Sequence, residues 1–221
     1  MVAPRAILFD FDYTLADSSA GVIESVNWAL ESMGMARQAD AAIRRTVGLS
    51  LGETFAKLTG GPVAQAPQFS ELFIRRADEV MADHTSLLPD TRAAVTTLAR
   101  RGHQLGVVST KFRRRIETVL TRDSLRAPFD IIVGGEDVPA HKPNPACLFA
   151  ALAALDIRAD EALYVGDSEV DGEAASRARI PFVGVLTGMA AKSSLAAWSP
   201  VAVLPTVGGL PEWLEGGRNE P

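Results

Sequence analysis

The sequence predicts an α/β fold: a parallel, Rossmann-like sheet flanked by helices, with an inserted α-helical domain. Short apolar runs alternate with helical patterns through most of the chain, and this alternation is typical of strands joined by crossover helices. Several runs are apolar throughout, as expected for strands covered on both faces. After the first run, however, a long stretch carries helical spacing with no convincing strand.

Six runs are expected to form the strands of this sheet. They occupy residues 6–9, 104–109, 129–134, 162–166, 181–186 and 201–205. Helical patterns connect or follow them at residues 90–101, 112–122, 145–156, 168–178 and 207–215. Because a strand–helix–strand connection is almost always right-handed, these strands should lie parallel in one sheet. We therefore predict a core domain formed by residues 1–16 and 86–221.

Residues 17–85 are predicted to form a separate helical domain inserted after the first strand. Stretches such as SAGVIESVNWALESMGM and QFSELFIRRADEVMADH have helical spacing. Gly34, Gly48 and the Gly60–Gly61–Pro62 stop separate the helices. The alternating pattern of the core resumes near Leu88–Pro89.

Composition and charge argue against several classes of protein. A hydrophobic content of 47% and a charged content of 22% over 221 residues are ordinary for a globular chain with a sizeable core. The net charge of −5 argues against a nucleic-acid binder, whereas a small anionic ligand needs only a few local cations. Cys147 is the single cysteine, so an internal disulfide is excluded and a reducing compartment fits.

The apolar segments are too short to target or anchor the chain in a membrane. The N-terminal run of three or four apolar residues falls short of a signal peptide. No stretch approaches the roughly 20 apolar residues of a membrane span. We expect a soluble, cytoplasmic protein with neither a nucleic-acid nor a membrane partner.

Polar side chains follow four of the predicted strands, either directly or a few residues farther on. They are Asp10 and Asp12 after the first strand, Ser109 and Thr110 after the second, Lys142 in the segment beyond the third, and Asp167, Ser168 and Asp171 after the fourth. In an open parallel sheet, ligands bind beyond the carboxyl ends of the strands. We therefore expect these side chains to converge at one edge of the sheet.

The chemistry of this edge points to a metal ion and a phosphoryl group. Carboxylates gathered at the end of an apolar sheet repel one another unless a cation joins them. Carboxylate and carbonyl oxygens suit Mg²⁺, which tends to share phosphate oxygens as ligands. Lys142 offers a positive charge to such a phosphate, and Ser109 and Thr110 offer hydrogen bonds.

Asp10 and Asp12 suit two complementary roles on one phosphate. An aspartate carboxylate is an established covalent nucleophile that forms an aspartyl-phosphate. A neighbouring acid protonates the leaving oxygen and then takes a proton from the attacking water. The strand would hold both carboxylates in place at its end.

Four motifs resemble those of the haloacid dehalogenase-like superfamily and occur in that family's order. They are DFDYTLADSS, VVST, KPNP and GDSEVD. The match covers nearly the whole chain. In addition, VGGEDVPAHKPNP together with DSSAGVIESVNWAL resembles the phosphoglycolate-phosphatase branch, and the helical insert is similar to the family's small cap domain.

The resemblance implies a role for each matched residue. Asp10 would be the nucleophile and Asp12 the general acid and base. Mg²⁺ would be bound by the Asp10 side chain, the Asp12 backbone carbonyl and Asp167, with Asp171 and Ser168 supporting the site or binding the metal. Ser109, the Thr110 amide and Lys142 would bind the phosphoryl group. Gly48 and Ser50 lie at a cap position that the family uses to contact substrate. Independently of the resemblance, the nearby Arg44 and Arg45 are candidates to meet an anionic group of the substrate.

One position departs from the family pattern. The family usually has glycine after the second aspartate, where this chain has Tyr13. With a bulky residue at this position, the sequence alone does not establish the backbone geometry near Asp12. Every charged position of the motifs is nevertheless intact.

The sequence therefore predicts a Mg²⁺-dependent phosphomonoester hydrolase that acts through an aspartyl-phosphate on a small phosphorylated metabolite, with phosphoglycolate as the first candidate. Two alternatives stay open. One is a phosphotransferase or phosphomutase of the same superfamily, and the other is a non-catalytic phospholigand-binding protein in which Tyr13 marks lost activity. The sequence does not decide between a monomer and a homodimer.

Overall fold

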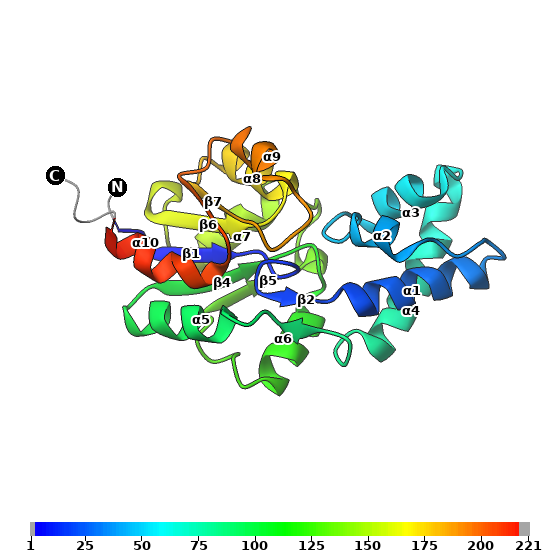
Figure 1. Cartoon of the computed structure of the whole chain (residues 1–221), viewed down its shortest axis with the longest axis horizontal. Coiled ribbons are helices and arrows are strands. Elements are labelled where there is room, and N and C mark those ends of the chain that lie inside the picture. The colour runs from blue at the N-terminus through cyan, green and yellow to red at the C-terminus, as the bar shows by residue number, and fades with distance from the viewer. Residues whose placement is uncertain (1–2, 217–221) are drawn as a thin grey trace. The chain divides into compact units, whose positions relative to one another are not determined.

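A parallel β-sheet organises the part of the chain that carries the predicted motifs (Figure 1). Across the described residues 3–216 of the computed structural model, the strand order is β5-β4-β1-β6-β7-β8. The strands are β1 Ala6–Phe9, β4 Gln104–Val108, β5 Ile131–Val133, β6 Ala162–Gly166, β7 Phe182–Val185 and β8 Ala202–Leu204. β1 lies between β4 and β6, with Phe9 opposite Val107 and Val165. The ends of these three strands are therefore side by side.

Helices cover both faces of this sheet. They are α5 Thr91–Arg100, α6 Arg113–Arg122, α7 Ala146–Leu155, α8 Glu169–Ala178, α9 Lys192–Ala196 and α10 Leu210–Gly216, with short 3₁₀ turns at Gly135–Asp137, Ala159–Glu161 and Val207–Gly209. In Figure 1, α8 and α9 lie above the sheet and α5 and α6 lie below it. All four residues of β1 are buried, because alternate side chains of a strand point to opposite faces and each face is covered.

The chain divides into two compact units by its contacts. One takes in the chain up to Ala16 and from Leu87 onward, and the other is Asp17–Ser86. The two-residue strands β2 Ala16–Asp17 and β3 Ser86–Leu87 lie where the chain passes from one unit to the other. We refer to these as the α/β unit and the helical unit.

The helical unit is built around a small aromatic and aliphatic core. Its helices are α1 Ser19–Ser32, α2 Asp40–Arg44, α3 Leu51–Thr59 and α4 Ala66–Val80, with a 3₁₀ turn at Val63–Gln65. Phe55, Phe69 and Phe73 stack successively in its core. α3 begins with a capping box between Ser50 and Glu53 and ends at Gly60, whose φ of 61° suits glycine.

The predicted α/β fold is confirmed, and the element positions agree closely with it. Each predicted strand of the core is present within one or two residues at either end. The predicted helix at 207–215 is instead a 3₁₀ turn followed by α10. α9 is an additional short helix that the sequence pattern did not indicate.

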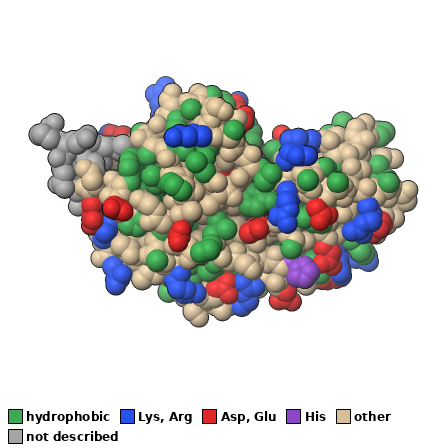
Figure 2. All heavy atoms as spheres, viewed as in Figure 1, with side chains coloured by type: hydrophobic (Ala, Val, Ile, Leu, Met, Phe, Trp, Pro, Cys, Tyr) green, Lys and Arg blue, Asp and Glu red, His purple; other side chains and the backbone are tan. Residues whose placement is uncertain are grey.

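The surface and the helices carry two further observations. On the face shown in Figure 2, basic and acidic side chains are interspersed. Of the helices between residues 3 and 216, none combines the length and the apolar character needed to cross a bilayer.

Candidate active site

The site begins where the central strands end. The Asp10 amide donates to the Val165 carbonyl at 2.9 Å, which continues the pairing of β1 with β6 by one residue. The Ser109 amide likewise donates to the Val133 carbonyl at 3.0 Å, beyond the end of β4. Ladder bonds therefore hold the backbones of Asp10 and Ser109 at the carboxyl edge of the sheet, where parallel folds bind ligands.

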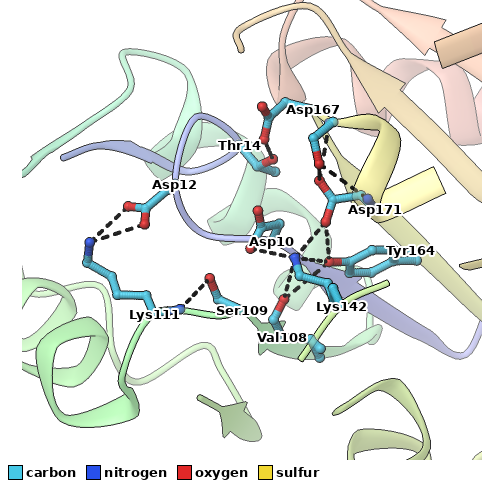
Figure 3. A network of polar contacts seen from close by, with 11 residues as sticks. Asp10, Asp12, Thr14, Val108, Ser109, Lys111, Lys142, Tyr164, Asp167 and Asp171 are labelled. Atoms are coloured by element: carbon cyan, nitrogen blue, oxygen red, sulfur yellow. Dashed lines mark hydrogen bonds and ion pairs between the residues drawn. The ribbon is translucent and has the colours of Figure 1, made fainter. Parts of the chain in front are cut away.

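Three buried carboxylates gather at this edge (Figure 3). Asp10, Asp167 and Asp171 each present an oxygen atom, and these atoms lie within 4.8 Å of one another. Asp167 also accepts a hydrogen bond from the Thr14 hydroxyl, with 3.0 Å between Oγ1 and Oδ1. Three such ligands at this spacing can hold a divalent cation.

Lys142 reaches the same cluster from the segment between β5 and α7. Its Nζ lies 3.0 Å from Asp10 Oδ1 and 2.6 Å from Asp171 Oδ1, and its side chain is 2% exposed. The ammonium group therefore links Asp10, the nucleophile candidate, to Asp171 in the first turn of α8.

Tyr164 is a member of the site that sequence reasoning missed. Its hydroxyl accepts from Lys142 Nζ at 2.8 Å and lies within donating distance of Asp171 Oδ1, at 2.9 Å, and of the Val108 carbonyl, at 3.2 Å. It lies on β6 within the run ALYVG, which reads as an ordinary buried strand. The feature of the sequence that could have indicated a role in the site is the tyrosine hydroxyl, because a buried tyrosine usually has a polar partner.

Asp171 is held by the start of α8. Its Oδ2 accepts from the Ser168 amide at 3.1 Å and from the Ser168 hydroxyl at 2.5 Å, while Ser168 Oγ accepts from the Asp171 amide at 3.2 Å. This reciprocal capping box fixes the helix start and the carboxylate together. Gly166 leaves the room for it, since a Cβ there would lie 2.5 Å from Asp171 Cγ.

The Asp12 side chain points away from the three-carboxylate cluster and pairs with Lys111 (Figure 3). Lys111 Nζ lies 3.1 Å from both Asp12 Oδ1 and Oδ2. The two side chains are only 4% and 9% exposed. Lys111 directly follows Thr110 in the chain and precedes α6. The structure places it in the site.

The turn that carries Asp12 explains why the family favours glycine at the next position. Tyr13 has a φ of 60°, in the left-handed region, where a side chain costs about 1–2 kcal/mol. Its amide donates to the Ala16 carbonyl, and its carbonyl accepts from the Thr187 hydroxyl. The chain therefore adopts the tight turn with a tyrosine, whose side chain is buried.

Burial and crowding of like charges shift the pKa values of the acids. Burial raises the pKa of Asp10 to about 6, although Lys142 opposes the shift, and Asp171 and Asp12 add to it. Burial, followed by repulsion from Asp171 and Asp10, raises the pKa of Asp167 well above its usual value. For Lys142, burial alone would lower the pKa, but Asp10 and Asp171 outweigh it and raise it. Burial and repulsion therefore disfavour the charged forms of Asp10 and Asp167.

Most of the predicted site residues share this edge of the α/β unit. Asp10, Ser109, Lys142, Asp167 and Asp171 come together there (Figure 3), Ser168 caps α8 beside Asp171, and Thr110 follows Ser109 in a partly exposed position. The predicted cap contacts belong to the helical unit. There Ser50 is the N-cap of α3, Gly48 has a φ of 91° and Arg45 is exposed.

Comparison with known proteins gives consistent results. The family model described as haloacid dehalogenase-like hydrolase matches residues 7–185. A phosphoglycolate phosphatase of Rhodospirillum rubrum is 31% identical, with 96% of this chain and 91% of the relative covered. One from Yersinia pseudotuberculosis is 30% identical, covering 91% and 89%.

Among solved structures, a Bacteroides fragilis protein described as a haloacid dehalogenase-like hydrolase has a TM-score of 0.90 and 40% identity. The match covers 94% of this chain and 99% of that one. The chain therefore belongs to the haloacid dehalogenase-like hydrolase family. The predicted resemblance to its phosphoglycolate-phosphatase branch is confirmed, and with it the enzyme class, a phosphatase.

Proposed function

We propose that this chain is a Mg²⁺-dependent phosphomonoester hydrolase that acts on a small phosphorylated metabolite through an aspartyl-phosphate at Asp10. The observation that carries the proposal is the position of Asp10. It stands at the end of the central strand, within a buried group of three carboxylates and beside the ammonium of Lys142.

The donor set fits Mg²⁺. Carboxylate oxygens are the ligands that this hard cation prefers, and Asp10, Asp167 and Asp171 bring them within 4.8 Å of one another. Burial and repulsion between the acids raise the pKa values of Asp10 and Asp167, and a bound cation would favour their charged forms. Asp10 and Asp167 would hold the ion with the Asp12 backbone carbonyl, and Asp171 would support them. The bound ion would neutralise charge on the phosphoryl oxygens.

In the first step, a carboxylate oxygen of Asp10 forms a bond to phosphorus while the bond from phosphorus to the leaving oxygen breaks. Lys142 neutralises charge on the transferring phosphoryl group, and the Ser109 hydroxyl and the Thr110 amide donate hydrogen bonds to it. The Tyr164 hydroxyl accepts a hydrogen bond from Lys142 Nζ and so keeps the ammonium group in place.

Asp12 moves the protons in both steps. It gives a proton to the leaving oxygen in the first step, so that the product departs as a neutral hydroxyl. In the second step it takes a proton from the water that attacks phosphorus, and the bond between Asp10 and phosphorus breaks to release orthophosphate. The same carboxyl therefore gives up one proton in the first step and regains one in the second.

The helical unit is proposed as the cap domain, residues 17–85, that selects the substrate. We retain Gly48, Ser50 and Arg45, the cap residues expected from the sequence, as proposed substrate contacts. Phosphoglycolate is the first candidate, because the similar curated proteins are phosphoglycolate phosphatases. A cap that closes over a bound substrate also excludes bulk water from the phosphoenzyme.

The test is the release of orthophosphate from a panel of phosphorylated metabolites, with Mg²⁺ and with a chelator. We expect Mg²⁺-dependent release, greatest for phosphoglycolate or another small monoester. An isomerised sugar phosphate without orthophosphate would instead favour the mutase. Tight ligand binding without turnover of any compound would favour the non-catalytic binder.

Asp10→Asn provides the matched control for this experiment. It keeps the size of the side chain and removes the nucleophile, so we expect no measurable turnover from a folded protein. Turnover near that of the wild type would refute the role of Asp10. A thermal melt of the variant establishes that it is folded.

A further inference from the structure

The geometry points to Lys111 as the residue that selects substrates whose leaving group carries a negative charge, such as a carboxylate or a second phosphate. This inference rests on the proposed phosphatase function. It starts from the ion pair between Lys111 and Asp12, which neither the motifs nor the comparisons assign to any role. Both side chains are almost fully buried, at 4% and 9% exposed.

The site has two positively charged groups with different surroundings. Lys142 Nζ lies against Asp10 and Asp171, 3.0 and 2.6 Å from their oxygens. Lys111 Nζ lies against Asp12, 3.1 Å from both carboxylate oxygens. Figure 3 shows Lys111 and Asp12 on one side of Asp10, and Lys142 and Asp171 on the other. The Lys142 ammonium therefore lies beside Asp10, the proposed nucleophile. The Lys111 ammonium lies beside Asp12, the proposed acid that protonates the leaving group.

The distance from Lys111 to the leaving oxygen follows from the role of Asp12. To transfer a proton, the Asp12 carboxyl must come within about 3 Å of that oxygen. Lys111 is one hydrogen-bond length farther on, so its ammonium lies within about 6 Å of the leaving oxygen. An anionic group one or two bonds from that oxygen is within reach of Lys111, whereas a neutral group gains nothing from it.

The backbone around Lys111 is held firmly enough to present the side chain in this position. Its amide donates to Ser109 Oγ at 3.3 Å, and its carbonyl accepts from the Gly135 amide at 3.1 Å. Gly135 permits this approach, because a Cβ there would lie 2.4 Å from the Thr110 carbonyl oxygen. The lysine stem is flexible and its charge is compact, so the ammonium can pair with a substrate anion beside Asp12.

The test compares two substrates that differ in one group. They are 2-phosphoglycolate, whose leaving group is glycolate and carries a carboxylate, and 2-hydroxyethyl phosphate, whose leaving group is ethylene glycol, neutral and of similar size. For Lys111→Gln we expect kcat/KM to fall about 10- to 100-fold on 2-phosphoglycolate, the scale of one charge-assisted hydrogen bond. On 2-hydroxyethyl phosphate we expect a smaller loss, which reflects only the missing ion pair with Asp12, so the ratio of the two kcat/KM values should fall. Lys192→Gln, the same change at an exposed position of α9, should alter neither.

Binding without turnover provides a second measurement. In the Asp10→Asn background, calorimetry should show that Lys111→Gln weakens binding of 2-phosphoglycolate but not of 2-hydroxyethyl phosphate. If Lys111→Gln does not fold, Lys111→Arg replaces it. Since this variant keeps the positive charge, retained preference for the anionic substrate supports the inference.

Three outcomes would overturn it. An equal loss on both substrates would mean that Lys111 only keeps Asp12 in place. Unchanged selectivity in Lys111→Gln would also overturn the inference. So would the loss of selectivity in Lys111→Arg, if this variant keeps normal activity on the neutral substrate. A wild-type protein that hydrolyses neither compound nor any other monoester contradicts the proposed function instead, and the binding measurement still decides the role of Lys111.

Discussion

At Tyr13, the free-energy cost of the left-handed backbone can be compared with the free energy gained by burying the side chain. Its φ of 60° carries the left-handed penalty of about 1–2 kcal/mol. Against this, its side chain is only 7% exposed, and truncating a buried aromatic side chain costs about 3–5 kcal/mol. Burial therefore outweighs strain, and the turn next to Asp12 keeps its shape.

Tyr13→Gly should accordingly destabilise the protein, although it installs the residue that the family favours. We expect a net loss of about 2 kcal/mol in the free energy of unfolding, measured by urea denaturation. A stabilised variant would show that the strain at Tyr13 exceeds the value of its packing.

Asp10 links stability to pH. Its pKa is about 6 in the fold and 3.8 in the reference state, so between these values the folded protein binds more protons than the unfolded chain. Stability from this group is therefore greatest at low pH and falls as the pH rises from about 4 to 6, by of order 2–3 kcal/mol in the absence of metal.

Asp10→Asn should remove this dependence. In chelator, we expect the variant to gain stability relative to the wild type as the pH rises from 4.5 to 7.5, measured by urea unfolding at each pH. Asp160→Asn, the same change at an exposed carboxylate, serves as the control. A difference between wild type and Asp10→Asn that does not vary with pH would contradict the raised pKa.

At the scale of elements, the loop that follows β7 closes against the acidic cluster. Gly188 permits it, because a Cβ there would lie 1.9 Å from Asp167 Oδ2. The Thr187 hydroxyl in the same loop donates to the Tyr13 carbonyl. The loop therefore supports both the proposed metal ligand and the turn that carries Asp12.

Gly188→Ala should displace Asp167 or the loop and so weaken Mg²⁺ binding. We expect the Mg²⁺ concentration for half-maximal activity to rise about tenfold or more, the scale of one weakened charged contact. The thermal stabilisation by Mg²⁺ should shrink in parallel. Gly209→Ala is the matched control, since its Cβ would meet only Leu204 at 3.9 Å. Equal Mg²⁺ requirements in the two variants would contradict this account.

The elements and most of the site could be predicted because their signals are local. β1 is an apolar run that ends at two aspartates, and the acids after β6 follow the same rule. Tyr164 and the pairing of Lys111 were not predictable in this way. Most of their partners are not neighbours in the chain, with 22 positions separating Tyr164 from Lys142 and 99 separating Lys111 from Asp12. α9 has only five residues, too few for a helical period to be distinctive.

At the scale of the whole molecule, the proposed chemistry is concentrated in the α/β unit. The sheet places four carboxylates there, those of Asp10, Asp12, Asp167 and Asp171, together with the ammonium groups of Lys111 and Lys142. In the proposed function, a divalent cation would balance the formal negative charge of these groups. Substrate selection by the helical unit is a separate proposal, which the panel of metabolites tests.

The most direct measurement is acid quenching of the enzyme during turnover of a labelled phosphomonoester, followed by mass spectrometry of its peptides. A base-labile phosphoryl group should be found on the peptide at Asp10, formed only with Mg²⁺ and absent from Asp10→Asn. Asp12→Asn should accumulate more of it if departure of the leaving group survives better than the attack by water. An enzyme that releases orthophosphate steadily, yet never carries a phosphoryl group at Asp10 in either protein, would contradict the covalent route.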